Sequence, residues 1–227
     1  MLSSYLFNVL YVVVVYLVLP IVVTSLHRYL CRKGIGAVID ARATKPNQIR
    51  NEIPYGMATC LIAAACLSAG AGYVAPYASF SYAALFLQFV LFAFVYDLYM
   101  YLAHRLLHTN VLARFHGVHH RSVVCTPWAS LSMHPIEAVL NYLPFLVLPV
   151  LYPMADLVLY GMFFYLLVGI IHSHSNYDLL ARSKVAPLLR RVLSFHQGHH
   201  SNARGSYGFA YTHWDSVFGT KLQAGSD

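Results

Sequence analysis

Long apolar segments constrain the fold of this chain more than any other feature of its sequence. Residues 5–26 are an almost unbroken run of Val, Leu, Tyr and Ile, and further apolar runs follow. A helix needs about 20 consecutive apolar residues to cross the hydrocarbon core of a bilayer. Since 59% of the 227 residues are hydrophobic and only 10% are charged, we predict an integral membrane protein.

We predict a single all-α domain, residues 1–227, that forms a bundle of four to five membrane-spanning helices under a histidine-rich, metal-binding cap. The expected spans are residues 5–26, 57–74, 82–103, 136–152 and 156–173. Pro20 predicts a kink near the end of the first span. The last two spans come from one apolar block that prolines interrupt, which fits either two spans or a re-entrant hairpin; we favour two spans. The N-terminal flank has neither Lys nor Arg, and no small-residue cleavage site follows, so the first span is interpreted as a retained anchor.

Basic residues indicate how the bundle is oriented. With five spans, all fifteen Lys and Arg fall on one side, in residues 27–50, 104–134 and 172–227. The opposite side, made of the N-terminus and the loops near residues 75–81 and 152–156, has none. Because Lys and Arg collect on the cytoplasmic side, we predict an outside N-terminus and a metal site that faces the cytoplasm, in a bacterial inner membrane or the endoplasmic reticulum. The net charge of +7 indicates attraction to anionic headgroups, and nothing indicates nucleic-acid binding.

The four cysteines form no CxxC pair, and they are interpreted as inert packing residues without disulfides. They are Cys31, Cys60, Cys66 and Cys125.

Histidines are concentrated in the polar segments, residues 104–134 and 172–220, which we predict to bind metal. Twelve of the thirteen lie in or beside these segments, and only His27 lies apart. "HRLLH" closes the third span, while "HGVHH" and "HQGHH" repeat one i, i+3, i+4 spacing that directs imidazoles to the same side of a helix. The histidines of these three motifs are His104, His108, His116, His119, His120, His196, His199 and His200.

Such a set of imidazoles indicates a dinuclear metal centre. Neutral imidazole binds iron, zinc and copper, and one ion takes about four to six ligands, so nine or ten clustered histidines imply two ions. The alternative is a histidine-rich surface that merely contacts solvent. Three clusters with helical spacing at the ends of spans favour the metal centre.

The motif series "HRLLH", "HGVHH", "HQGHH" resembles the histidine-box signature of the fatty acid hydroxylase and sterol desaturase superfamily of membrane non-haem di-iron enzymes. "QIRNEI", "TPWASLSMHPIE" and "SYGFAYTHWDSVFGT" resemble segments of the sterol C5-desaturases (lathosterol oxidases) in that superfamily. The resemblance extends from about Gln48 to Thr220. Trp128 stands where these enzymes usually have Phe, and Ser206 where they usually have Asn.

The resemblance implies that the histidines of the three motifs are metal ligands, and it adds His174 from "HSHSN". His172 and His134 are left open, either as ligands or as hydrogen-bond donors to ligands. For Asp97 two interpretations stay open: acceptance of an N–H from a ligating imidazole, or pairing with Arg105 or Arg121.

The resemblance further implies two iron ions, with O2 as co-substrate, in an enzyme that hydroxylates or desaturates a membrane lipid. Iron is favoured over zinc because zinc has no redox chemistry and cannot activate dioxygen. A sterol or sterol-like lipid is the expected substrate, with fatty acyl or other lipid hydroxylation as the alternative. Electrons are expected from a separate donor of the cytochrome b5, ferredoxin or reductase type.

Two other classes fit the sequence less well. A zinc-dependent membrane hydrolase is expected to carry a carboxylate base, as in HExxH, and the sequence has no such motif. A membrane cytochrome is expected to place its paired histidines deep inside facing spans, whereas here they lie at the ends of spans and come in adjacent doublets.

Overall fold

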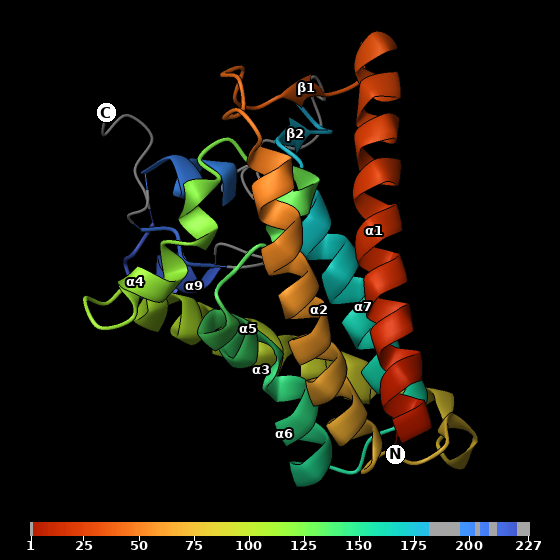
Figure 1. Ribbon diagram of the computed structural model, residues 1–227. Coiled ribbons are helices and arrows are strands. Elements are labelled where there is room, and N and C mark those ends of the chain that lie inside the picture. The colour runs from red at the N-terminus through yellow and green to blue at the C-terminus, as the bar shows by residue number, and fades with distance from the viewer. Residues whose placement is uncertain (1, 182–195, 203–204, 209–212, 222–227) are drawn as a thin grey trace.

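The computed structural model describes residues 2–181, 196–202, 205–208 and 213–221. Four of its helices are long and apolar enough to cross a membrane: α1 (Leu2–Arg32), α2 (Gln48–Ala71), α3 (Tyr82–Leu107) and α7 (Asp156–Ser173). α1, α2 and α7 pack side by side, and α3 passes behind them toward the end of the molecule that carries α4 and α9 (Figure 1). The predicted all-α membrane bundle is confirmed.

Three of the four long helices extend beyond the apolar runs that predicted them at one end or both, while α7 has the predicted bounds. α1 continues past Pro20 to Arg32, and α3 reaches Leu107, so that its last turn carries a histidine. α2 begins at Gln48, well before the expected residue 57, and its first turns carry the buried polar residues Gln48 and Glu52. A run of apolar residues predicts the part of a helix that faces lipid. It does not predict polar turns of the same helix that are buried against protein.

The expected span 136–152 consists of two eight-residue helices, α5 (Pro135–Tyr142) and α6 (Pro144–Leu151). Pro144 is the first residue of α6, where its missing N–H leaves no helical bond unmade. The pair leads from the histidine-bearing end to the opposite end of the bundle (Figure 1). There Ala75 N–H donates to the Met154 carbonyl (3.0 Å), and Asp156 N–H donates back to the Ala75 carbonyl (2.9 Å). The two loops that the charge pattern places on one side therefore lie together.

Short elements complete the described chain. β1 (Ala37–Val38) pairs antiparallel with β2 (Tyr177–Asp178) and so ties the connector between α1 and α2 to the segment after α7. The remaining elements are η1 (Tyr77–Ser79), α4 (Ala113–His116), η2 (His119–Arg121), η3 (Pro127–Leu131), a helical segment at residues 196–202, and α9 (His213–Val217).

The bundle packs tightly around aromatic side chains. The Phe145 ring lies 4.9 Å from that of Phe163 and 5.3 Å from that of Phe92, between centroids. A Cβ atom on Gly70 of α2 would lie 1.9 Å from the Phe145 carbonyl oxygen, so this close contact between helices requires glycine. On α1, by contrast, many apolar side chains are exposed, Phe7 and Leu10 among them, as expected of a surface that contacts lipid.

All four cysteines are free, as expected. Cys60 and Cys125 are buried, in keeping with a packing role, whereas Cys31 is exposed.

Candidate metal centre

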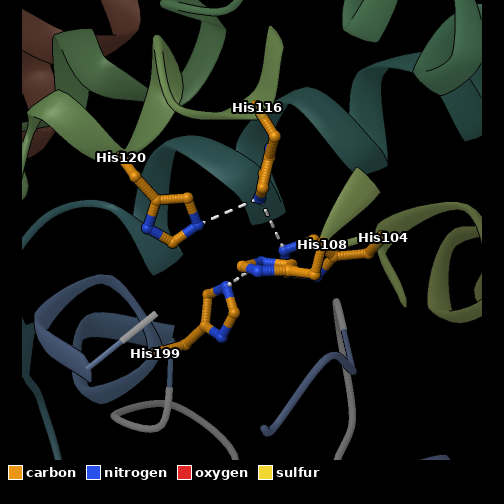
Figure 2. A group of neighbouring side chains, drawn as sticks. All are labelled: His104, His108, His116, His120 and His199. Carbon is orange, nitrogen blue, oxygen red and sulfur yellow. Dashed lines mark hydrogen bonds between the residues drawn. The ribbon is translucent and has the colours of Figure 1, made fainter. Parts of the chain in front are cut away.

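Two groups of histidines converge at one end of the bundle. The first is called the five-histidine group: one ligand nitrogen from each member lies within 4.8 Å of the others. Figure 2 shows these imidazoles pointing toward a common centre from separate segments. Its members are His104, His108, His116, His120 and His199. The second is called the four-histidine group and is equally close; its members are His119, His174, His196 and His200.

Each group draws on segments far apart in the chain. The end of α3, the segment formed by α4 and η2, the end of α7 and residues 196–202 carry all of these histidines. The second and third motifs contribute to both groups, because His119 and His120 are divided between them, as are His199 and His200. The doublets therefore link the two neighbouring groups, which accounts for the repeated HH pairs.

Ring nitrogens approach one another at distances that suit a shared ion. The Nε2 atom of His116 lies 3.1 Å from that of His104 and 2.9 Å from that of His120. Two nitrogens that each bind one ion at about 2.1 Å are about 3 Å apart when they lie at right angles around it. The spacing therefore fits imidazoles that ligate a common metal.

Backbone carbonyls determine which ring nitrogen carries the proton in four of these histidines. A carbonyl only accepts hydrogen bonds, so the Nδ1 atom facing it must be protonated, and Nε2 of a neutral ring then presents a lone pair. The four Nδ1 to carbonyl pairs are His104 with Tyr207 (2.9 Å), His119 with Ser132 (3.1 Å), His174 with Ile170 (2.8 Å) and His199 with Gly205 (2.8 Å).

The lone pairs of His119 and His174 face each other across 3.1 Å between their Nε2 atoms. Neither nitrogen has a proton to donate, so their approach is repulsive unless a cation lies against both. His200 is a second feature that suits a bound metal. It is 2% exposed, and neither of its ring nitrogens has a hydrogen-bond partner among the described residues. Buried, unsatisfied nitrogens of this kind are costly, and a metal would satisfy them.

Burial keeps the imidazoles neutral at physiological pH. Desolvation lowers the pKa of His116 and His119 to about 4, and it lowers the pKa of His199 to about 3. The pKa of His108 also falls to about 4, through desolvation and then through the neighbouring His116 and His119. Because only the neutral ring offers a lone pair, these shifts favour metal binding.

Comparison with known proteins agrees with this geometry. The sequence profile described as "Fatty acid hydroxylase" matches residues 89–220, which is more than half of the chain and includes all three histidine motifs. The chain belongs to the fatty acid hydroxylase family. The resemblance inferred from the motifs is thereby confirmed.

Curated relatives of this fatty acid hydroxylase family member are named as sterol desaturases or lathosterol oxidases. Human lathosterol oxidase is 30% identical over 146 residues, which is 64% of this chain and 47% of the relative. The Aspergillus fumigatus Delta(7)-sterol 5(6)-desaturase erg3B is 30% identical over 136 residues, 60% of this chain and 39% of the relative. The chain thus spans less than half the length of these relatives. No solved structure matches it.

All nine histidines that the sequence assigns to the metal lie in the two groups; their role as ligands stays a prediction. His172 and His134 lie in neither group. The His172 ring contacts His27 (5.6 Å between centroids), and His134 Nδ1 accepts from the N–H of Ile136 at the start of α5 (3.2 Å). His27, which the sequence sets apart, also stacks on Tyr177 (4.3 Å).

The structure gives Asp97 partners that the sequence did not indicate. Its Oδ2 accepts from Trp214 Nε1 (2.8 Å) and lies 3.4 Å from His213 Nε2. A carboxyl group that does contact an imidazole of the five-histidine group is that of Glu137, whose Oε1 lies 2.8 Å from His116 Nδ1. Burial lowers the pKa of His116 to about 4, so without metal its ring is neutral and the pair is a hydrogen bond without an imidazolium charge.

Sequence reasoning did not find Glu137 or Asp215, although both lie in segments singled out for their resemblance, "TPWASLSMHPIE" and "SYGFAYTHWDSVFGT". Asp215 is fully buried and accepts from Tyr207 N–H (2.7 Å) and Gly208 N–H (2.8 Å). It also accepts from the Thr220 hydroxyl (2.7 Å). Each of these two segments contains one acidic residue, and that is the signal by which sequence reasoning could have found Glu137 and Asp215.

Proposed function

We propose that this protein is an O2-dependent oxidoreductase that hydroxylates or desaturates a membrane lipid, with two iron ions bound in the histidine groups. One observation carries the proposal: the Nε2 atoms of His119 and His174, each with a lone pair and no proton, lie 3.1 Å apart inside a buried cluster of imidazoles. Membership of the fatty acid hydroxylase family supports the class of reaction.

Iron is favoured over zinc by the composition of the site. Five imidazoles form one group, which exceeds the four ligands of a structural zinc site and the three protein ligands of a catalytic one. Among the described residues neither group contains a carboxylate, whereas a zinc hydrolase requires a base beside its activated water. When bound, an iron pair would supply the dioxygen chemistry needed to attack an unactivated C–H bond.

The protein's own residues hold and orient this centre. The nine histidines would ligate the metals, and in four of them a backbone carbonyl directs the Nε2 atom toward the ion. With a metal on Nε2, His116 would keep its proton on Nδ1 and donate it to Glu137. Since most of these rings are buried, the site excludes bulk water from the reacting groups.

A sterol or sterol-like lipid is the proposed substrate, and fatty acyl or other lipid hydroxylation is the alternative. The names of the curated relatives favour a sterol. Trp128 adds support, because it lines a cavity of about 650 Å³ together with Ile21 and Ile49, and this cavity extends to Asn176, two residues beyond His174. A rigid aromatic face in such a cavity suits stacking against fused rings.

The metal centre is proposed to face the cytoplasm and to receive electrons from a separate donor of the cytochrome b5, ferredoxin or reductase type. The positive-inside pattern supports this orientation. So does the structure, because the loops at residues 75–81 and 152–156 lie together at the end remote from the histidines. Among the described basic residues, Arg42, Lys45 and Arg121 lie near the histidine-bearing segments, where they would attract an acidic donor.

The test supplies the purified, reduced protein with dioxygen and either a Δ7-type sterol or long-chain acyl lipids, and detects oxidised lipid by mass spectrometry. We expect oxidised sterol from the wild-type protein and none from His119→Ala. Oxidation of acyl lipids without any sterol product would refute the sterol assignment. No oxidised lipid of either kind from iron-loaded protein would refute the enzymatic function.

A further inference from the structure

A buried carboxylate on α2 holds the segment that follows the second histidine motif. Glu52 is 3% exposed. Its Oε1 accepts from Gln48 Nε2 (2.7 Å) and from the Ser122 hydroxyl (2.7 Å), while its Oε2 accepts from the Thr126 hydroxyl (2.6 Å). Gln48 Nε2 also donates to the Val124 carbonyl (2.9 Å). Residues 122–126, called the 122–126 loop, are thus fixed to the start of α2 at both ends.

The same loop is held from its other side by the third histidine motif. Gln197, the second residue of "HQGHH", is 2% exposed. Its Oε1 accepts from Cys125 N–H (3.0 Å), and its Nε2 donates to the Val123 carbonyl (2.9 Å). One side chain therefore satisfies a backbone donor and a backbone acceptor of the 122–126 loop, which fixes the position of the helical segment 196–202 against it.

We propose that Glu52 and Gln197 are positioning residues that set the third histidine motif in register with the rest of the metal centre, through the 122–126 loop between them. This inference rests on the proposed metal function. Neither side chain belongs to a histidine group, so both act through others: Glu52 fixes the loop, and Gln197 fixes the motif to the loop.

The geometry predicts which metal is affected. Residues 196–202 supply two of the four imidazoles in the four-histidine group, His196 and His200, but only His199 in the five-histidine group. His199 is also held from another segment, because its Nδ1 donates to the Gly205 carbonyl (2.8 Å). Displacement of the motif therefore weakens the four-histidine group first and leaves the five-histidine group largely intact.

The principal variant is Gln197→Leu, which keeps the approximate volume but leaves the Cys125 N–H and the Val123 carbonyl without their partner. Its matched control is Gln88→Leu. Gln88 is also a buried glutamine, 4% exposed, and its Oε1 accepts from a backbone N–H, that of Ala155 (3.0 Å), at the opposite end of the bundle. Both variants remove an amide that satisfies buried backbone, but only one of them touches the third histidine motif.

The readout is anaerobic titration of purified, metal-free protein with ferrous iron, with the bound iron counted per folded chain. We expect two sites in the wild-type protein and in Gln88→Leu. In Gln197→Leu we expect one site with wild-type affinity and one weakened about 10-fold to 100-fold, the range found when groups that support metal ligands are removed. A merely structural role for Gln197 would lower thermal stability in both variants and leave both affinities unchanged.

Two substitutions of Glu52 test the same proposal independently, one that removes its hydrogen bonds and one that preserves them. Glu52→Leu removes all three hydrogen bonds and should weaken the same site as Gln197→Leu. In Glu52→Gln the amide oxygen still accepts, and the amide nitrogen donates to a hydroxyl that is able to accept, so iron binding should return to near the wild-type level. Because both residues act through one loop, the double variant Glu52→Leu, Gln197→Leu should weaken the site by less than the product of the two single effects.

Two results separate the possible failures. If Gln197→Leu and Glu52→Leu bind two ferrous ions with the affinities of the wild-type protein, the positioning role is wrong and the metal centre stands. If the wild-type protein itself binds no ferrous iron, the proposed function is wrong, and this inference is refuted with it.

Discussion

Asp215 allows a prediction of how the closing segment supports the metal centre. Its carboxylate is fully buried and accepts from the backbone N–H groups of Tyr207 and Gly208. The segment that it holds, residues 205–208, presents the carbonyl of Gly205 to His199 Nδ1 and that of Tyr207 to His104 Nδ1. Both histidines belong to the five-histidine group. Asp215→Ala should therefore release the carbonyls that orient two of its five imidazoles.

The magnitude follows from the hydrogen bonds that Asp215→Ala removes. Hydrogen bonds to a charged group contribute about 1.5–3 kcal/mol each, so removing the two from backbone N–H groups should lower the free energy of unfolding by about 3–6 kcal/mol. Iron affinity at the five-histidine group should fall about 10-fold to 100-fold, while the four-histidine group retains its iron. This selectivity is the reverse of that expected for Gln197→Leu.

The assay combines thermal unfolding in detergent with anaerobic titration by ferrous iron. The matched control is Asp156→Ala, because Asp156 Oδ1 also accepts from two backbone N–H groups, those of Tyr77 (2.8 Å) and Leu157 (2.6 Å), far from the histidines. We expect the control to lose stability without any change in iron binding. If Asp215→Ala bound both ions as tightly as the wild-type protein, Asp215 would not orient the ligands and the reasoning would be refuted.

Three further predictions concern the bundle as a whole. Gly70→Ala should destabilise by about 1–3 kcal/mol, since its Cβ meets the backbone of Phe145 and the helices must separate, whereas Gly161→Ala, with open space around it, should be nearly neutral in thermal unfolding. Removal of bound iron by a chelator should lower the melting temperature, because an ion at 100 times its Kd stabilises by about 2.7 kcal/mol; an unchanged melting temperature would argue against bound metal. Accessibility labelling from the two sides of sealed membranes should place Ala78 outside and Lys45 inside; labelling of both from one side would overturn the predicted topology.

The sequence predicts the elements whose causes are local. Apolar runs of sufficient length locate the four long helices. The i, i+3, i+4 spacing predicts that each motif lies on one helix, but the second motif is divided, since α4 ends at His116 and η2 begins at His119. The structure brings the three motifs together, as expected from their place at the ends of the spans. What the sequence cannot show is how nine imidazoles divide between two groups, because His119 and His120 are adjacent in the chain and yet belong to different groups.

The supporting residues escape sequence reasoning because their contacts are not local. Glu52 meets Ser122 across 70 positions, and Asp97 meets Trp214 across 117. No periodicity connects such pairs, and a carboxylate near a span is as consistent with a surface ion pair as with a buried anchor. Asp97 shows this limit: the sequence leaves open a metal-site imidazole or an arginine as its partner, and it does not indicate the contacts with Trp214 and His213.

Metal analysis of protein purified from iron-replete cells, with an optical spectrum of the same sample, tests the central claim most directly. If the two histidine groups are iron sites, the protein should contain about two irons per chain, and its spectrum should lack a Soret band, because about four to six ligands per ion assign nine imidazoles to two ions. Zinc in place of iron, a haem spectrum, or no bound metal in folded protein would contradict the account.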